Sequence, residues 1–457
     1  MFTSILNTLS NCFKIPELKS RILFTMIVLG ICRLASLVPV PNLNSGLLKA
    51  YFESAAGSQS SNGLMGMYSM FTGGGFEKCA VGALGIMPYI SATIILQLLQ
   101  AVVPFLSKLA REEGGRSKIT QYGRVGTLFL CLAQGLVMAL GWEHPSVPFP
   151  GFHGQLVMTT HLWWYRIETT VILATGTMLL MWLGEQITDR GIGNGISLII
   201  TVGILARLPQ AGRGLMDMFL TPGTNFNFFH LIALILLLCA VIAGVVAVTQ
   251  AERKIPVQYA QRVVGRKTYS GGSSFMPLRV NYSGVMPVIF ASAILMFPSM
   301  ILNFLGRRFD IHFFEELGSM LSRGSFIYLL LYGLMILFFS YFWVATQFNE
   351  LQISDDMKKS GGYIPGVRPG QATSSFLHRT MSRITLAGAI FLTIIAVIPI
   401  ILQEAMTIPY TVAQFFGGTS LLITVGVMLD TMRQMEAHLL MRHYDGFLKK
   451  GRLKGRF

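Results

Sequence analysis

Long apolar segments recur along the whole chain, and they constrain its fold more than any other feature. Runs of about twenty mostly apolar residues, the length that crosses about 30 Å of hydrocarbon as a helix, return from near residue 20 to near residue 432. In a water-soluble domain about a quarter of the residues are charged, whereas only 12% of these 457 residues are charged. The sequence therefore predicts an all-α polytopic membrane protein.

Ten segments have this character, and we predict that each is a transmembrane helix. They are residues 20–38, 79–105, 121–141, 168–184, 196–206, 229–249, 284–304, 326–346, 384–403 and 412–432. An even number of spans places both termini on one side of the membrane. The first span follows a short basic stretch and no small-residue cleavage site follows it, so we expect a retained helix rather than a removed signal peptide.

The positions of the 36 Lys and Arg residues indicate the orientation. If the N-terminus is cytoplasmic, most of them fall in cytoplasmic segments, as the positive-inside rule requires. Two of these segments, 250–283 and 347–383, are long and basic. They are either solvated loops that set the orientation or docking loops for a large anionic partner, such as ribosomal RNA or the acidic face of a motor protein.

A sequence repeat relates the two halves of the chain. Residues 85–93 (GIMPYISAT) resemble residues 284–292 (GVMPVIFAS), and both are followed at the same offset by Ile-Leu. The first copy opens a span that starts outside, and the second opens a span that starts inside, so the repeat is inverted as in many membrane transport proteins. The alternative is a chance similarity of two Pro-containing helix starts. The repeat predicts two five-helix halves around a central pathway.

Two apolar segments are expected to be too short to cross the bilayer. One is bounded by glycines and consists of Leu64, Met65, Gly66, Met67, Tyr68, Ser69, Met70 and Phe71. Because short helices at membrane depth need protein or a water-filled cavity around them, this segment is either a movable piece in a vestibule or an interfacial helix on the outer leaflet. The other follows a Gly-rich stretch and runs from Ile196 to about Ala206.

The sequence contains no motif for enzymatic turnover. It has no phosphate-binding Gly-rich loop and no His-Glu-x-x-His, and its five scattered cysteines lack metal-ligand or redox spacing. We therefore expect no enzyme activity, no cofactor and no metal site. Ser91 and Gln134 are polar groups in apolar helices, and such residues either hydrogen-bond a neighbouring helix or take part in gating.

Two functions fit these features. One is a channel for unfolded polypeptides, which needs an apolar waist and docking loops. The other is an ion- or solute-coupled secondary transporter with the same inverted repeat. The lack of paired carboxylates near the bilayer midplane counts against the transporter, because such groups carry the coupling charge.

Four motifs in order give the chain a resemblance to a known family. Residues 83–92, 183–197, 365–370 and 417–423 look like the signature stretches of the SecY family, the central subunits of bacterial protein-conducting channels. The resemblance covers almost the full length. It implies a channel that passes unfolded secretory polypeptides across the bacterial plasma (inner) membrane and releases hydrophobic segments sideways into lipid. The implied parts are an N-terminal half (1–210) with a plug near 63–75, a C-terminal half (211–440), and a basic cytoplasmic tail (441–457).

The resemblance also assigns roles to residues and partners. A pore ring would consist of Ile86, Ile90, Ile196, Ile200, Ile289 and Ile423. Residues 64–71 would form the plug, and Ser91 and Gln134 would lie at a lateral gate between the second and seventh spans. The ribosome or the SecA motor would bind Arg253, Lys254, Arg266, Lys267 and Arg368. Lys254 stands where the family often has a second arginine, and lysine cannot reproduce a bidentate contact. Small subunits like SecE and SecG are further implied partners.

Overall fold

The computed structural model describes residues 15–55, 68–69, 71–112, 114–145, 149, 152, 154–220, 228–259, 262–264, 267–269, 273–309, 312–321, 325–406 and 419–450. Each predicted span overlaps one helix: α2 (Pro16–Ala35), α5 (Met87–Val102), α7 (Gly115–Glu143), α8 (Leu162–Arg190), α9 (Gly195–Leu205), α11 (Phe228–Gln250), α12 (Met286–Phe309), α14 (Phe326–Gln347), α16 (Gln371–Met406) and α18 (Thr419–Lys450). By length and composition, six described helices can cross a membrane, or seven if one bent pair counts as a span. The count of ten therefore stays a prediction.

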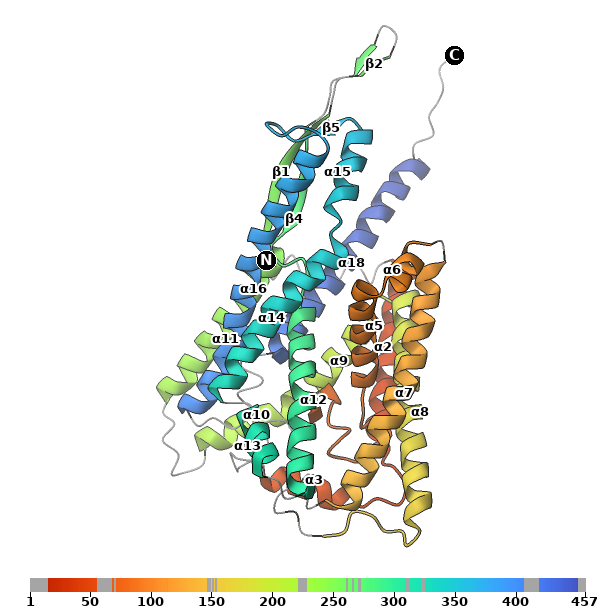
Figure 1. The fold of residues 1–457 in the computed structure, drawn as a ribbon, viewed down its shortest axis with the longest axis vertical. Helices are drawn as coiled ribbons and strands as arrows, with labels where there is room; N and C mark the ends of the chain where they lie inside the picture. Colours follow the sequence, from red (N-terminus) through yellow and green to blue (C-terminus); the bar gives the residue numbers. More distant parts are fainter. Residues whose placement is uncertain are drawn as a thin grey trace.

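The long helices form two bundles that face each other (Figure 1). One bundle contains α2, α5, α7, α8 and α9, and the other contains α11, α12, α14, α16 and α18. Their internal packing is alike, since α5 contacts α7 and α7 contacts α8, just as α12 contacts α14 and α14 contacts α16. Between the bundles α5 contacts α12, and α9 contacts α18. Equivalent helices of the repeat thus meet each other, as two halves related by a pseudo-two-fold axis require.

The two copies of the sequence repeat start their helices in the same way. α5 begins at Met87 and α12 begins at the equivalent Met286, and each has a proline in its first turn, where the missing N–H costs no helical hydrogen bond. Two residues earlier, Gly85 and Gly284 have φ angles of 59° and 63°. This left-handed backbone favours glycine, so the repeat preserves the turn that starts each helix.

The second span is shorter than the predicted 79–105. Residues 71–86 form a series of hydrogen-bonded turns, because Gly73, Gly74 and Gly85 take left-handed conformations that a helix excludes. At the other end Pro104 has no N–H to continue the helix, and α6 (Pro104–Arg111) turns away by 103°. The expectation of a helix over residues 79–86 is therefore wrong.

The fifth apolar segment is longer than the sequence indicated. α9 is followed after two residues by α10 (Leu208–Leu220), and residues Gly195–Met216 together are long and apolar enough to span a membrane. The Ala211 N–H donates to the Arg207 carbonyl oxygen at 3.0 Å, so helical hydrogen bonding resumes directly at the junction. The expectation that this segment is too short is therefore wrong. The expected domain boundary at residues 210 and 211 falls inside α10.

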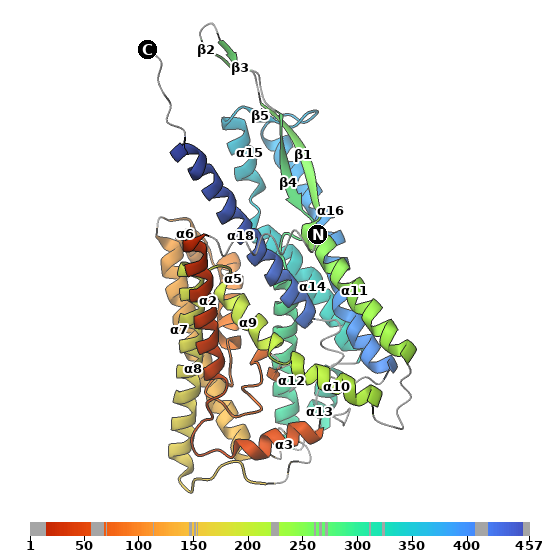
Figure 2. The same ribbon diagram turned by 180° about the vertical axis from the view of Figure 1, so that it is seen from behind.

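Short elements lie at both ends of the bundles. At one end α3 (Ser45–Ala55), α10 and α13 (His312–Met320) lie across the helix ends (Figure 2). At the opposite end β1 (Glu252–Tyr259) pairs antiparallel with β4 (Ser273–Arg279), and β5 (Gly362–Tyr363) adds to the other edge of β1. β2 (Arg262–Val264) and β3 (Lys267–Tyr269) form a separate pair beyond them. α15 (Glu350–Lys359) packs against α16 and β5.

The two long basic segments fold as one unit, which we call the platform (residues 252–259, 273–279 and 348–384). Its apolar core contains Ile255 of β1, Leu278 of β4, Phe348 after α14, Ile364 after β5 and Leu377 of α16. Each of these side chains is buried, with 0 to 6% exposed. The predicted loop 347–383 is therefore largely helical, and it packs against the predicted loop 250–283.

Candidate pore and plug

The predicted pore ring draws on four helices from both bundles, α5, α9, α12 and α18. These helices contact one another in the order α5, α12, α18, α9. Five of the six residues belong to one apolar cluster and are at most 5% exposed: Ile86, Ile90, Ile200, Ile289 and Ile423. Ile196 is half-buried and packs against this cluster. The structure thus places the six side chains in the apolar region where the two bundles meet.

Two of the ring residues occupy equivalent positions down to their hydrogen bonds. Thr93 Oγ1 donates to the carbonyl oxygen of Ile90 at 2.8 Å, and Ser292 Oγ donates to the carbonyl oxygen of Ile289 at 2.8 Å. In each case the hydroxyl is satisfied by the preceding turn of its own helix. The pairing of Ile90 with Ile289 by the sequence repeat is confirmed in local structure.

Val285 is a further candidate ring residue that the sequence reasoning missed. It is the equivalent of Ile86 in the repeat, it is 9% exposed, and it belongs to the same apolar cluster. A Cβ atom on Gly426 of α18 would lie only 2.5 Å from Val285 Cγ1, so α18 approaches α12 closely at this point. The repeat carried the signal for Val285, because it aligns the two residues directly.

Three residues of the predicted plug are described, and all three are buried. Tyr68, Ser69 and Phe71 are 6%, 0% and 4% exposed, and Tyr68 and Phe71 belong to the same apolar cluster as the ring. This burial favours a segment enclosed by protein over a helix lying on the outer leaflet. The other plug residues lie outside the described residues: Leu64, Met65, Gly66, Met67 and Met70.

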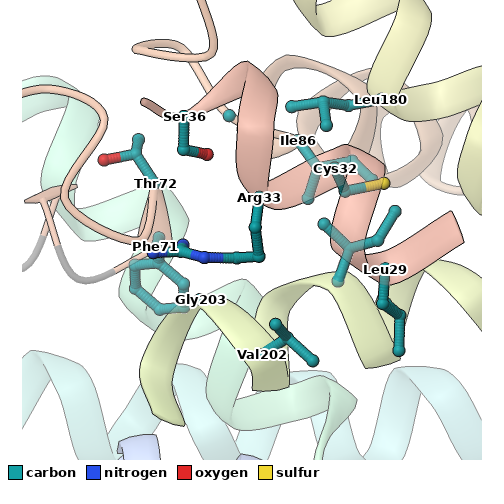
Figure 3. Close-up of a pocket in the computed structure, with 12 residues that line it drawn as sticks. Leu29, Cys32, Arg33, Ser36, Phe71, Thr72, Ile86, Leu180, Val202 and Gly203 are labelled. Carbon is teal, nitrogen blue, oxygen red and sulfur yellow. The ribbon is translucent and has the colours of Figure 1, made fainter. Parts of the chain in front are cut away.

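A small cavity separates the segment after the plug from α2, α8 and α9 (Figure 3). Arg33 extends from α2 toward Phe71 and Gly203, and its Nη1 donates to the carbonyl oxygen of Gly73 at 3.1 Å. A Cβ atom on Gly73 would lie 2.3 Å from Arg33 Nη1 and 2.9 Å from the Cα of Gly203. Backbone therefore packs directly on backbone between this segment and α9, which glycine alone permits.

A polar cluster lies close to these glycines. Arg207, at the junction of α9 and α10, forms an ion pair with Glu77, and its Nη2 also donates to Ser69 Oγ. Ser69 Oγ in turn donates to the Glu77 carboxylate at 2.8 Å. The side chains of Arg207 and Glu77 are 15% and 16% exposed. Sequence reasoning missed this cluster, although charges that flank apolar segments were its visible signal.

The two candidate lateral-gate residues lie in the same bundle. Ser91 is on α5, and its hydroxyl oxygen is buried without a hydrogen-bond partner among the described residues. No described residue supplies a hydrogen bond from a neighbouring helix to Ser91, and the choice between the two roles stays a prediction. Gln134 is half-buried on α7, whereas the bundles meet through α5 with α12 and through α9 with α18.

Three of the five candidate docking residues, Arg253, Lys254 and Arg368, lie on the platform. Arg253 and Lys254 are exposed on β1, and Arg368 is exposed in the turn between β5 and α16. Lys254 Nζ lies 3.6 Å from Glu252 Oε1, and Thr373 Oγ1 donates to the carbonyl oxygen of Arg368 at 2.9 Å. Because β5 pairs with β1, the two exposed segments belong to one folded unit. Lys267 is in β3, and Arg266 lies outside the described residues.

Within the described parts of the chain, no three His, Cys, Asp or Glu side chains come together as a metal site. Four cysteines fall in these parts and all of them are free thiols: Cys32, Cys79, Cys131 and Cys239.

Comparison with known proteins gives one family. The SecY family model matches residues 80–432. The protein translocase subunit SecY of Chlamydia trachomatis is 44% identical over 98% of this chain and 99% of its own length. The corresponding subunit of Thermotoga maritima is 41% identical over 98% of this chain and 98% of its own length. That of Escherichia coli is 40% identical over 96% of this chain and 96% of its own length.

Solved structures of channels share the fold. A protein-conducting channel superimposes with a TM-score of 0.61, and a SecY protein whose plug domain stabilises the closed state superimposes with 0.62. Their sequences are 19% and 20% identical to this one, and 92% of each chain is covered. A canine ribosome-channel complex from the endoplasmic reticulum gives a TM-score of 0.57. The two-bundle architecture is therefore that of protein-conducting channels.

Proposed function

This chain belongs to the SecY family of protein translocase subunits, and from that premise we propose that unfolded polypeptides cross it between its two bundles, through the ring formed by α5, α9, α12 and α18. It is a multi-pass membrane protein, and its relatives are translocase subunits rather than coupled transporters. The observation that carries the proposal is the joint burial of five ring side chains from both bundles in one apolar cluster, with the half-buried Ile196 packed against it.

The ring acts as a seal because all six of its side chains are apolar. A narrow apolar collar holds water poorly, so it blocks ions while the channel rests. Its isoleucines are branched at Cβ and stiff at χ1, so the collar keeps its shape and yields only when the bundles separate. No covalent step is involved, and any work on the polypeptide comes from a partner.

Sideways release follows from the contact of α5 with α12. When these helices part, a segment in the ring is exposed to lipid on that side. A segment rich in Leu, Ile and Val then lowers its free energy by leaving the pore, whereas a polar segment stays in the aqueous path. Sorting between secretion and membrane insertion is thus a partition equilibrium.

The platform is proposed to face the cytoplasm and to bind the ribosome or a SecA motor through Arg253, Lys254 and Arg368. The C-terminal part of α18 extends at the same end as the platform (Figure 1). This agrees with cytoplasmic termini and with the positive-inside rule. SecE- and SecG-like subunits would cover lipid-facing helices, and the membrane would be the bacterial plasma membrane.

Planar-bilayer conductance tests the ring. Replacing Ile90, Ile200 and Ile289 together with asparagine places hydrogen-bonding groups in the collar, so we expect water to enter it and the resting ion conductance to rise severalfold. Three leucines at the same positions keep the collar apolar and serve as the matched control. Unchanged conductance of the asparagine variant would refute the ring.

The docking role is tested separately. Arg368→Glu reverses an exposed charge, and we expect it to lower partner affinity and preprotein delivery into vesicles by about tenfold or more. Arg213→Glu, a charge reversal on α10 at the opposite end, is the control and should leave delivery unchanged. Normal preprotein delivery by the Arg368→Glu variant would refute the docking role of the platform.

A further inference from the structure

Two ion pairs join α7 to α8 at two separate levels. Arg124 of α7 donates two hydrogen bonds to the carboxylate of Glu185 on α8, from Nε at 3.1 Å and from Nη2 at 2.8 Å. Arg166 of α8 bonds the carboxylate of Glu143 on α7 in the same way, at 2.9 and 2.8 Å. We call them the inner pair and the outer pair, after the proposed orientation. Because two parallel hydrogen bonds fix both side chains, each pair holds the helices in register.

The separation of the two pairs is the same on both helices. Arg124 and Glu143 are 19 residues apart on α7, and Arg166 and Glu185 are also 19 residues apart on α8. At about 1.5 Å per residue, this separation is about 28 Å, close to the hydrocarbon thickness of a typical bilayer. Between the pairs, Glu168 is the only charged residue on either helix, and it lies two positions from Arg166. The ion pairs therefore bound an apolar length that matches the bilayer.

One face of α8 exposes a continuous stripe between these levels. Its exposed residues recur every three or four positions: Trp164, Ile167, Val171, Thr175, Leu179 and Trp182. The hydroxyl of Thr175 donates to the carbonyl oxygen of Val171 at 2.7 Å, so this polar group is satisfied within the helix. The stripe therefore suits contact with acyl chains, which offer no hydrogen-bond partners.

Tryptophan side chains mark both ends of the stripe. Trp164 is 71% exposed and Trp182 is 54% exposed, and they are 18 residues apart, or about 27 Å along the helix. The exposed ring of Trp163 lies 5.4 Å from the guanidinium carbon of Arg166, so it covers the outer pair. Because indole rings favour the boundary between hydrocarbon and head groups, the tryptophans indicate the same two levels as the ion pairs.

The equivalent helices of the second bundle lack this arrangement. α14 and α16 correspond to α7 and α8 in their packing, but α14 contains no charged residue and forms no ion pair with α16. Tyr341 of α14 instead donates its hydroxyl to the carbonyl oxygen of Ser382 at 3.1 Å. The two ion-pair levels are thus a property of α7 and α8 and not a requirement of the repeat.

We propose that α7 and α8 form a ruler that sets the depth of the first bundle and fits it to a hydrocarbon layer about 28 Å thick. Acyl chains of phospholipid cover the stripe, and both ion pairs lie at the level of the head groups. A thicker bilayer would draw a pair into hydrocarbon and a thinner one would leave apolar side chains in water, so both cost free energy. The inference goes beyond the proposed function, because it requires only that the chain crosses a membrane.

Quenching of tryptophan fluorescence by brominated phospholipids tests the two levels, with the assembled channel in vesicles. Trp163→Phe combined with Trp164→Phe leaves Trp182 as the exposed tryptophan, since Trp142 and Trp343 are buried. We expect bromine near the glycerol end of the acyl chain to quench Trp182 more strongly than bromine near the chain end. The same order is expected for Trp164 when the other two exposed tryptophans are replaced by phenylalanine.

Two results of this experiment would overturn the ruler. Stronger quenching by bromine near the chain end would place the tryptophans inside the hydrocarbon. An absence of quenching would show that a protein partner, and not lipid, covers the stripe.

Val171→Trp, made with all three exposed tryptophans replaced by phenylalanine, is the matched control. Val171 is 52% exposed and lies on the same stripe between the two levels. Bromine near the chain end should quench this variant most strongly. If it is instead quenched in the same order as the terminal tryptophans, the stripe lies along the membrane surface, and the ruler is refuted.

Competition between a brominated lipid and phosphatidylcholines of different chain length tests the fitted thickness. The wild type should bind most tightly the lipids whose hydrocarbon layer is about 28 Å thick. Arg124→Leu combined with Glu185→Leu removes the inner pair, and the next charged residues are Lys118, six positions away, and Asp189, four positions away. We expect the preferred layer to become about 6 Å thicker, because four helical residues add that length.

Glu350→Leu combined with His378→Leu is the matched control for this change. These residues form a 2.8 Å pair between α15 and α16 on the platform, so their replacement should leave the preferred chain length unchanged. An unchanged preference in the variant without the inner pair, or an equal change in the control, would overturn the ruler. Neither experiment measures translocation or ion conductance, so their failure would leave the proposed function standing.

Discussion

The two copies of the repeat begin with the same turn, but they are packed very differently. The residue after the ring isoleucine is Ser91 in the first copy and Phe290 in the second. Phe290 is 3% exposed and packs edge-on against Phe339 and Trp343, with ring centroids 5.8 and 5.5 Å apart. The Ser91 hydroxyl has no partner among the described residues. The second copy is therefore anchored in its bundle, and the first is not anchored at this position.

The turns before α5 and α12 also differ in how closely other residues pack against them. A Cβ atom on Gly85 would lie 3.2 Å from Thr72 Cγ2, whereas a Cβ atom on Gly284 would meet nothing within 4 Å. The first copy is thus covered by the segment that follows the plug, and the second is open. The comparison teaches that a repeat can preserve the backbone while the neighbouring side chains anchor one copy in its bundle more firmly than the other.

The largest expected difference is between Phe290→Ala and Ser91→Ala. Phe290→Ala removes the aromatic anchor and should lower the free energy of unfolding by about 2 kcal/mol, less than in a water-soluble core because the unfolded helix stays in lipid. Ser91→Ala removes a buried hydroxyl that none of the described residues bonds, and it should change stability by less than about 0.5 kcal/mol. Unfolding in detergent, followed by tryptophan fluorescence, measures both. Equal losses would contradict the difference in anchoring.

A smaller difference is expected between Gly85→Ala and Gly284→Ala. Both place a side chain at a left-handed position and should cost about 1 kcal/mol of strain. Only the alanine at residue 85 presses against Thr72, so only that variant should also raise resting conductance in planar bilayers. A rise for the variant at residue 284 would show that the strain alone opens the channel.

The smallest effects are expected at the two hydroxyls that make equivalent hydrogen bonds in the two copies of the repeat. Thr93→Val and Ser292→Ala each remove one hydroxyl that bonds the carbonyl of a ring isoleucine. Each should change stability by about 0.5 kcal/mol or less, because the helix retains its backbone hydrogen bonds. The two changes should agree with each other, measured by the same unfolding experiment. A clear inequality would break the equivalence of Ile90 and Ile289.

The architecture could be predicted from local patterns in the sequence. Runs of apolar residues overlap every helix of the two bundles, and the repeat at 85–93 and 284–292 predicted a proline in the first turns of both helices and the equivalence of Ile90 with Ile289. The extent of α5 was missed, because three left-handed glycines interrupt an otherwise apolar run. The extent of α9 was missed for the opposite reason, since helical hydrogen bonding resumes at a polar residue, Arg207.

Contacts between distant segments could not be predicted in this way. Glu77 and Arg207 are far apart in sequence, and neither belongs to a motif or to the repeat. The pairing of β1 with β5 likewise joins two segments that were each identified only as basic loops. Hydropathy indicates whether a residue lies in water or in lipid. It does not indicate which charged side chains form an ion pair, because ion pairing depends on how distant segments pack together.

The platform has a mechanical consequence. Its core is continuous with the second bundle, since Val344 and Phe348 adjoin α14, and Leu377 and Ile384 lie on α16. A Cβ atom on Gly388 of α16 would lie 2.6 Å from the Val280 carbonyl, so the link from β4 to α12 rests on α16 as well. A force that the proposed docking partner applied to the platform would thus act directly on the second bundle, and it would reach the bundle that carries Arg207 only through the contacts between the bundles.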